Sequence, residues 1–180
     1  MNIKGVSHYL GLLCFPISIL AFINILYSSY FDYYLSIDSY FTTLLISFFS
    51  GIFFLLLGKN CVKRINFIEQ LLLIIFTYLL ISILISIPFY LSNYQVTFIN
   101  SLFESISGLT GTGFSIFKNI KYLDPTLILW RSSSQWIGGL YFLFSIILLI
   151  DIFDNNLKKS LTNFLSFNTS EIVKQSFKIF

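Results

Sequence analysis

Residues 67–91 read FIEQLLLIIFTYLLISILISIPFYL, and Glu69 is the only charged side chain among them. A helix needs about 20 predominantly apolar residues to cross the hydrocarbon core of a bilayer. This run is longer, so we predict a transmembrane helix with enough length to tilt. Lipid rather than water is the solvent that suits such a segment.

Three other runs meet the same requirement, namely Tyr9–Tyr27, Tyr40–Leu57 and Leu127–Ile150. The first follows Lys4, as the apolar part of a signal peptide would. No small-residue cleavage site comes after it, so we expect an uncleaved helix. The predicted fold class is an all-α integral membrane protein with four transmembrane helices.

The composition agrees with this class. Of the 180 residues, 56% are hydrophobic and 11% are charged, whereas a soluble domain carries about a quarter charged residues. The net charge of +3 is small and dispersed. It therefore argues against a nucleic-acid-binding surface and leaves membrane lipid as the expected environment.

Residue types that carry catalysis are too few for an enzyme. The chain has one histidine, His8, and two cysteines, Cys14 and Cys61, which we expect to be reduced. These residues supply neither a metal-ligand cluster nor a Ser-His-Asp set. We therefore expect no enzymatic activity and no cofactor.

Residues 97–114, TFINSLFESISGLTGTGF, form a different kind of segment. Apolar residues recur at helical spacing up to the glycines, about 12 residues along, which is too short to span a bilayer. A short amphipathic helix followed by glycines is typical of a re-entrant pore helix and filter loop. Such backbone is tolerated at membrane depth only against protein or a water-filled cavity.

The positions of the basic residues indicate that residues 97–114 enter and leave the membrane on the same side. They lie before the first run, between the second and third, and after the last, at Lys4, Lys59, Lys63, Arg64, Lys158 and Lys159. By the positive-inside rule these regions and both termini are cytoplasmic, provided that residues 97–114 do not cross the membrane. Lys118 and Lys121 are then external, against the trend.

This layout divides the chain into three parts. Residues 1–66 form an N-terminal transmembrane helix pair, residues 67–150 a helix–pore loop–helix repeat, and residues 151–180 a cytoplasmic tail. Apolar residues recur in the tail as they do in an amphipathic helix lying on the inner surface. A solvated linker is the equally weighted alternative.

Four residues, Thr110, Gly111, Thr112 and Gly113, are the candidate ion-binding residues. Backbone carbonyls can replace the hydration shell of a large monovalent cation, and glycine reaches the positive φ angles that turn carbonyls toward one axis. The threonine hydroxyls serve either as further ligands or as braces. A tight turn between helices is the competing interpretation.

A polar stretch in the last run, Arg131–Gln135, must lie at membrane depth if that helix is to reach about 20 residues. Polar residues there usually face protein or a cavity. We hypothesise that Arg131 pairs with Glu104 of the short helix and supports the loop. The alternative is that Arg131 reaches the outer interface beside Trp130. The pair Gly138–Gly139 would let another helix approach closely.

The stretch FESISGLTGTGFS at 103–115, followed by LILWRSSSQWIGG at 127–139, resembles the first pore repeat of the TrkH/KtrB potassium-uptake family. The two helices before the repeat match the extra N-terminal pair of the TrkH branch. The resemblance implies that Gly113 is the filter glycine and that residues 110–113 bind potassium. It further implies potassium symport across the bacterial inner membrane, with a cytosolic nucleotide-binding regulatory subunit as a partner.

Two features depart from the family. Its filters often have threonine where this chain has Gly111, a change that would loosen the loop. Its members carry four pore repeats, whereas this sequence contains one, which provides only one wall of a cage. We expect a pore-forming subunit, or the N-terminal part of one, whose other repeats come from another chain or from copies of itself. A truncated or accessory membrane protein without transport of its own is the alternative.

Overall fold

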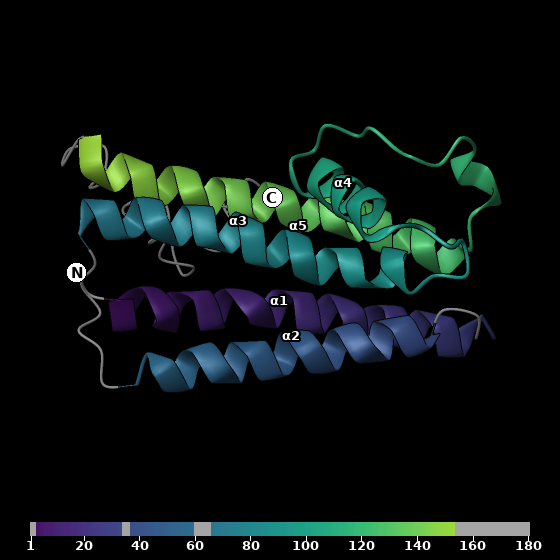
Figure 1. Cartoon of the computed structure of the whole chain (residues 1–180), viewed down its shortest axis with the longest axis horizontal. Coiled ribbons are helices and arrows are strands. Elements are labelled where there is room, and N and C mark those ends of the chain that lie inside the picture. The colour runs from purple at the N-terminus through teal and green to yellow at the C-terminus, as the bar shows by residue number, and fades with distance from the viewer. Residues whose placement is uncertain (1–2, 34–36, 60–65, 154–180) are drawn as a thin grey trace, which may run out of the picture. The chain divides into compact units, whose positions relative to one another are not determined.

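The computed structural model describes residues 3–33, 37–59 and 66–153. These ranges hold no strand, and their helices are α1 (Ile3–Tyr30), α2 (Ile37–Leu57), α3 (Phe67–Tyr90), α4 (Phe98–Leu109), the 3-10 helix η2 (Ile120–Tyr122) and α5 (Pro125–Phe153) (Figure 1). Four of them, α1, α2, α3 and α5, are long and apolar enough to cross a membrane. The predicted all-α class with four membrane-spanning helices is confirmed, and the chain is of the multi-pass membrane type.

The described residues up to Leu143 form one compact unit, and α5 continues beyond it into a second. The divisions of the chain after residues 66 and 150 stay predictions. Most of the predicted tail lies outside the described residues. So do several residues used above, namely Cys61, Lys63, Arg64, Lys158 and Lys159.

Helix ends differ modestly from the predicted runs. Helix α1 extends beyond Tyr9–Tyr27 at both ends, because helical hydrogen bonding continues past the apolar stretch that marks the bilayer core. Helix α5 starts at Pro125, where Asp124 Oδ1 accepts from Thr126 N at 3.2 Å. Aspartate followed by proline is a common helix start, since proline needs no partner for a backbone donor in the first turn.

Small residues bring α1 and α2 together. A Cβ atom placed on Gly11 would lie 2.8 Å from the carbonyl oxygen of Gly51, so these two backbones are nearly in contact. Ser18 Oγ and Ser47 Oγ share a buried hydrogen bond of 2.8 Å between the same helices. Such close approach is how helices pack where lipid removes the hydrophobic driving force between them.

Large aromatic side chains of α5 attach it to the other helices. The indole Nε1 of Trp130 donates to the carbonyl of Ile85 on α3 at 3.1 Å. The hydroxyl of Tyr141 donates to the carbonyl of Leu13 on α1 at 2.5 Å. Trp130 is only 1% exposed, so it is a core residue and offers Arg131 no interfacial neighbour.

The segment between α3 and α5 returns to the end from which it starts. Tyr94 precedes α4, and its hydroxyl accepts from Asp124 N at 2.8 Å and donates to the carbonyl of Tyr122 at 3.5 Å. In Figure 1, α4 and its loop lie over the half of α3 and α5 that adjoins this connection. A re-entrant segment must begin and end on the same side of the membrane, and these hydrogen bonds hold its two ends side by side.

Candidate ion-binding site

Helix α4 is a short helix with a defined beginning and end. Thr97 caps it, because its hydroxyl accepts from Asn100 N at 3.4 Å. Twelve residues later the helix ends at Leu109, and Thr110 N still donates to the carbonyl of Ile106 at 2.9 Å. The structure therefore places the candidate ion-binding residues directly after the helix, as the sequence predicted.

The two glycines of the loop both adopt positive φ, 71° at Gly111 and 77° at Gly113. Only glycine enters this region without steric cost. A Cβ atom at either position would have no neighbour within 4 Å in the described chain, and residues 110–113 are all exposed. The glycines are thus required by backbone conformation, and the face of the loop is open.

Glu104 binds the residues that follow the two glycines, on the side of the loop that faces the protein. Its carboxylate is buried, and Oε1 lies 2.5 Å from Arg131 Nε on α5. Oε1 and Oε2 also accept from Ser115 Oγ at 3.1 and 3.2 Å, and Oε2 accepts from Ile116 N at 3.0 Å. One carboxylate therefore joins α4, the outgoing loop and α5.

Arg131 also contacts the loop directly. Its Nη2 donates to the carbonyl of Gly113 at 3.1 Å and to that of Phe114 at 3.4 Å. The expected pair with Glu104 is present, and this second set of contacts was not foreseen. Arg131 lies inside the candidate span of α5, where a charge is expected to have such partners.

Ser107 is a further contact residue, for which the sequence predicted no role. Its hydroxyl donates to the carbonyl of Phe114 at 2.6 Å and accepts from the Thr112 hydroxyl at 3.1 Å. Thr110 Oγ1 donates to the carbonyl of Ile106 at 2.8 Å. Both threonine hydroxyls thus have partners on α4, which favours braces over ligands. Ser107 belongs to the stretch 103–115 that carries the family resemblance.

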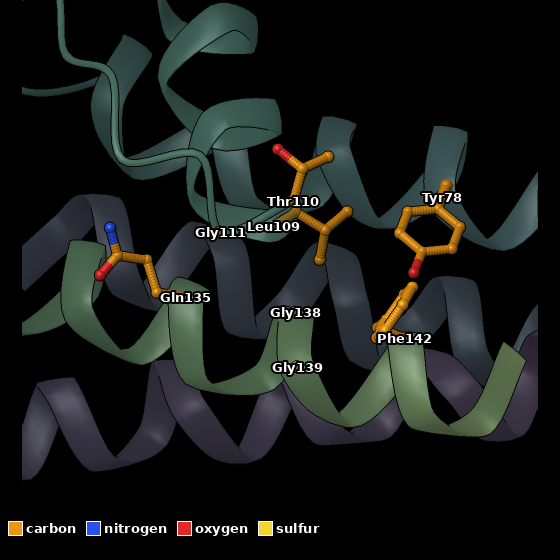
Figure 2. A pocket seen from close by; sticks show the side chains of 8 residues that line it. All are labelled: Tyr78, Leu109, Thr110, Gly111, Gln135, Gly138, Gly139 and Phe142. Carbon is orange, nitrogen blue, oxygen red and sulfur yellow. The ribbon is translucent and has the colours of Figure 1, made fainter. Parts of the chain in front are cut away.

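A hollow of about 380 Å³ adjoins the loop (Figure 2). It lies between α3, the end of α4 and α5, and its lining is Tyr78, Leu109, Thr110, Gly111, Gln135, Gly138, Gly139 and Phe142. A side chain at Gly138 would clash with the carbonyl of Leu109, whereas one at Gly139 would meet nothing within 4 Å. We predicted that another helix would approach both glycines closely. Within the described chain α4 approaches Gly138, and no segment comes close to Gly139.

Comparison with known proteins gives partial matches. An uncharacterised cation transporter of Methanocaldococcus jannaschii is 29% identical over 140 residues, which cover 77% of this chain and 28% of that relative. The Trk system potassium uptake proteins TrkI of Halomonas elongata and TrkG of Escherichia coli are 36% and 32% identical over 72 and 73 residues. This chain is similar to Trk potassium uptake proteins. The Trk-type resemblance expected from residues 103–139 is confirmed.

The Trk-type similarity covers only part of each relative. The chain spans 28% of the length of the first and 15% of the length of the other two, and the two Trk matches each cover 40% of this chain. This coverage is consistent with an N-terminal portion of a TrkH/KtrB-family protein. No family profile matches the chain, and no solved structure is a significant match.

Proposed function

We propose that this chain is a pore-forming part of a Trk-type potassium uptake system, with residues 110–113 as one wall of its potassium site. The observation that carries the proposal is an exposed loop with two glycines at positive φ, held from behind by Arg131 and Glu104. A rigid loop with an open carbonyl face suits replacement of an ion's hydration shell. The names of the similar proteins, a cation transporter and potassium uptake proteins, agree with this ion class.

The chemistry of the loop favours a large monovalent ion. Divalent ions such as Ca²⁺ and Mg²⁺ take carboxylate ligands, and residues 110–113 carry none. The nearby carboxylate of Glu104 is buried and paired with Arg131. Neutral carbonyl oxygens are therefore the groups that remain for a cation at this surface.

One loop can contact only one side of a bound cation, so a complete potassium site needs further loops. Residues 110–113 are exposed in the described chain, and a cation there would keep water on its open side. We propose that other pore repeats, from another chain or from copies of this one, close the site. From the family resemblance we also propose symport, a bacterial inner membrane as the location, and a cytosolic nucleotide-binding regulatory subunit as a partner. From the positive-inside rule we propose that both termini are cytoplasmic.

The test is potassium-dependent growth and rubidium uptake in a bacterium that lacks its own uptake systems. The chain is expressed alone, and in a second experiment its residues 97–139 replace the corresponding pore repeat of a Trk protein, which gives a chimera. Uptake by the chimera that is lost in Gly113→Ser supports the proposal. Uptake by the chain alone, lost in the same variant, adds that copies of this chain complete the pore.

The alternative is an accessory membrane protein without transport of its own. It predicts a chimera that reaches the membrane at normal levels and yet takes up no rubidium. It also predicts that Gly113→Ser has no effect on any phenotype of the chain. Either result, with membrane insertion confirmed, would replace the transport proposal.

A further inference from the structure

We infer that Ser107 is a positioning residue that sets which oxygen atoms the loop presents to a cation, leaving the carbonyls of residues 110–112 free. The inference rests on the proposed function and adds a residue to it. Ser107 lies in the last turn of α4 and is only 4% exposed. It makes four contacts with the loop, two through its hydroxyl and two through its carbonyl.

The hydroxyl of Ser107 joins two groups that flank Gly113. Thr112 Oγ1 lies 3.1 Å from Ser107 Oγ, and Ser107 Oγ donates to the carbonyl of Phe114 at 2.6 Å. A hydroxyl supplies one donor and accepts as well, so both bonds form together. This relay turns the Thr112 side chain toward α4 and holds the Phe114 carbonyl inward.

The carbonyl of Ser107 fixes the same stretch a second time. The single proton of the Thr112 hydroxyl is shared between Ser107 Oγ and this carbonyl, which lies 3.3 Å from Thr112 Oγ1, and Gly113 N donates to the carbonyl at 3.5 Å. Hydroxyl and amide groups of consecutive loop residues are therefore satisfied on the side of α4. The backbone carbonyls of Thr112 and Gly113 therefore do not take part in these contacts with α4.

The carbonyl oxygens of the loop fall into two groups, those that accept hydrogen bonds and those that do not. The carbonyls of Gly113 and Phe114 accept from Arg131 Nη2, and that of Phe114 also accepts from Ser107. In the described part of the chain, the carbonyls of residues 110–112 accept no hydrogen bond. A guanidinium beside the Gly113 carbonyl disfavours a second cation there. Gly113 thus contributes its φ angle, and residues 110–112 contribute the ligands.

Ser105 provides a matched control on the same helix. It is fully buried, and its hydroxyl donates to the carbonyl of Leu102 at 2.8 Å, within α4. Ser105→Ala removes one hydroxyl and one hydrogen bond without touching the loop. Ser107→Ala removes the relay, and Ser107→Thr retains a hydroxyl at that position.

The first test does not depend on transport. Hydrogen exchange is measured on the purified chain in lipid nanodiscs, at the amides of Gly113 and Ile116. Ser107→Ala keeps the partners of both amides, Ser107 O and Glu104 Oε2, but it removes the two hydroxyl bonds that hold Thr112 and Phe114. The loosened loop should speed exchange at these amides by at least about fivefold. Ser105→Ala should match the wild type and Ser107→Thr should restore protection. Equal exchange in Ser107→Ala and Ser105→Ala would overturn the inference.

The second test uses the Trk chimera described above and measures rubidium uptake against sodium uptake. Ser107→Ala should lower this ratio severalfold at equal membrane levels, with Ser105→Ala unchanged and Ser107→Thr restored. An unchanged ratio in Ser107→Ala overturns the inference while leaving the proposed function intact. If the unmutated chimera takes up no rubidium, the proposed function fails, and the exchange measurement still decides whether Ser107 holds the loop.

Discussion

The Nε atom of Arg131 lies 2.5 Å from Oε1 of Glu104, so an arginine inside a candidate membrane span and a carboxylate on a short helix form one ion pair. The pair is 27 positions apart in sequence. It connects α5 to α4 behind the loop that carries the two glycines at positive φ. The same guanidinium also holds the Gly113 carbonyl, so the pair and the loop form one hydrogen-bonded unit.

Removal of either charge should destabilise the chain, and Arg131→Gln should do so more than Glu104→Gln. The Glu104 side chain is 0% exposed and that of Arg131 is 13% exposed, so an unpaired carboxylate is left with less access to water. Breaking a buried pair costs about 3–5 kcal/mol. Unfolding in detergent, followed by circular dichroism, measures the effect, and the exposed Lys118→Gln is the control. A smaller loss for Arg131→Gln than for Glu104→Gln would contradict this prediction.

Exchange of the two charges, Glu104→Arg with Arg131→Glu, should restore only part of the lost stability. The carboxylate of Glu104 accepts from Ile116 N, and the guanidinium of Arg131 donates to the Gly113 carbonyl. Exchange would place a donor against the amide and an acceptor against the carbonyl. Thermal unfolding of the double variant beside both single variants tests this. Complete recovery would show that the pair acts by charge alone.

The effect of substituting Gly113 should be set by the backbone conformation that the new residue can adopt, rather than by the room available for its side chain. Its φ is 77°, and a Cβ there would meet no described atom within 4 Å. Alanine in this region costs about 1–2 kcal/mol, whereas asparagine adopts it more readily. Rubidium uptake by the chimera should therefore fall more in Gly113→Ala than in Gly113→Asn. An equal loss in both would mean that the other walls of the pore leave no room for a side chain.

The adjacent glycines of α5 should respond in opposite ways. Gly138→Ala would push against the carbonyl of Leu109 at the end of α4 and should destabilise the purified chain by about 1–3 kcal/mol. Gly139→Ala meets no described atom and should be neutral or slightly stabilising, because alanine favours helix over glycine by about 1 kcal/mol. Unfolding midpoints of the two variants test the contrast. Similar midpoints would contradict the packing of α4 on α5.

The contact between α1 and α2 should tolerate a methyl group better on one side than on the other. A Cβ on Gly11 would lie 2.8 Å from both Gly51 O and Leu55 N, whereas a Cβ on Gly51 would lie 3.2 Å from its nearest atom. Gly11→Ala should therefore destabilise by about 1–3 kcal/mol and Gly51→Ala by less. Unfolding in detergent measures both. The reverse order would show that the helices shift to accommodate Gly11→Ala.

Much of the candidate site could be anticipated from residues 97–114. The sequence predicted a short helix that stops at the glycines, and α4 ends at Leu109. It also predicted an ion pair between Glu104 and Arg131, because two lone charges near membrane depth favour each other. Ser107 lies in the stretch 103–115 that carries the family resemblance, but the sequence predicted no contact for it, because its partners are set by the tertiary structure.

The sequence by itself determined the four membrane-spanning helices, the short α4 and the need for glycine in the loop. These follow from hydropathy and backbone preference, which are properties of residues close together in the chain. The tertiary structure alone decided that Ser107 holds Phe114, that Arg131 holds Gly113 and that Gly138 admits the end of α4. Those contacts depend on how separate segments approach one another, because a hydrogen bond forms only when donor and acceptor come within about 3–3.5 Å.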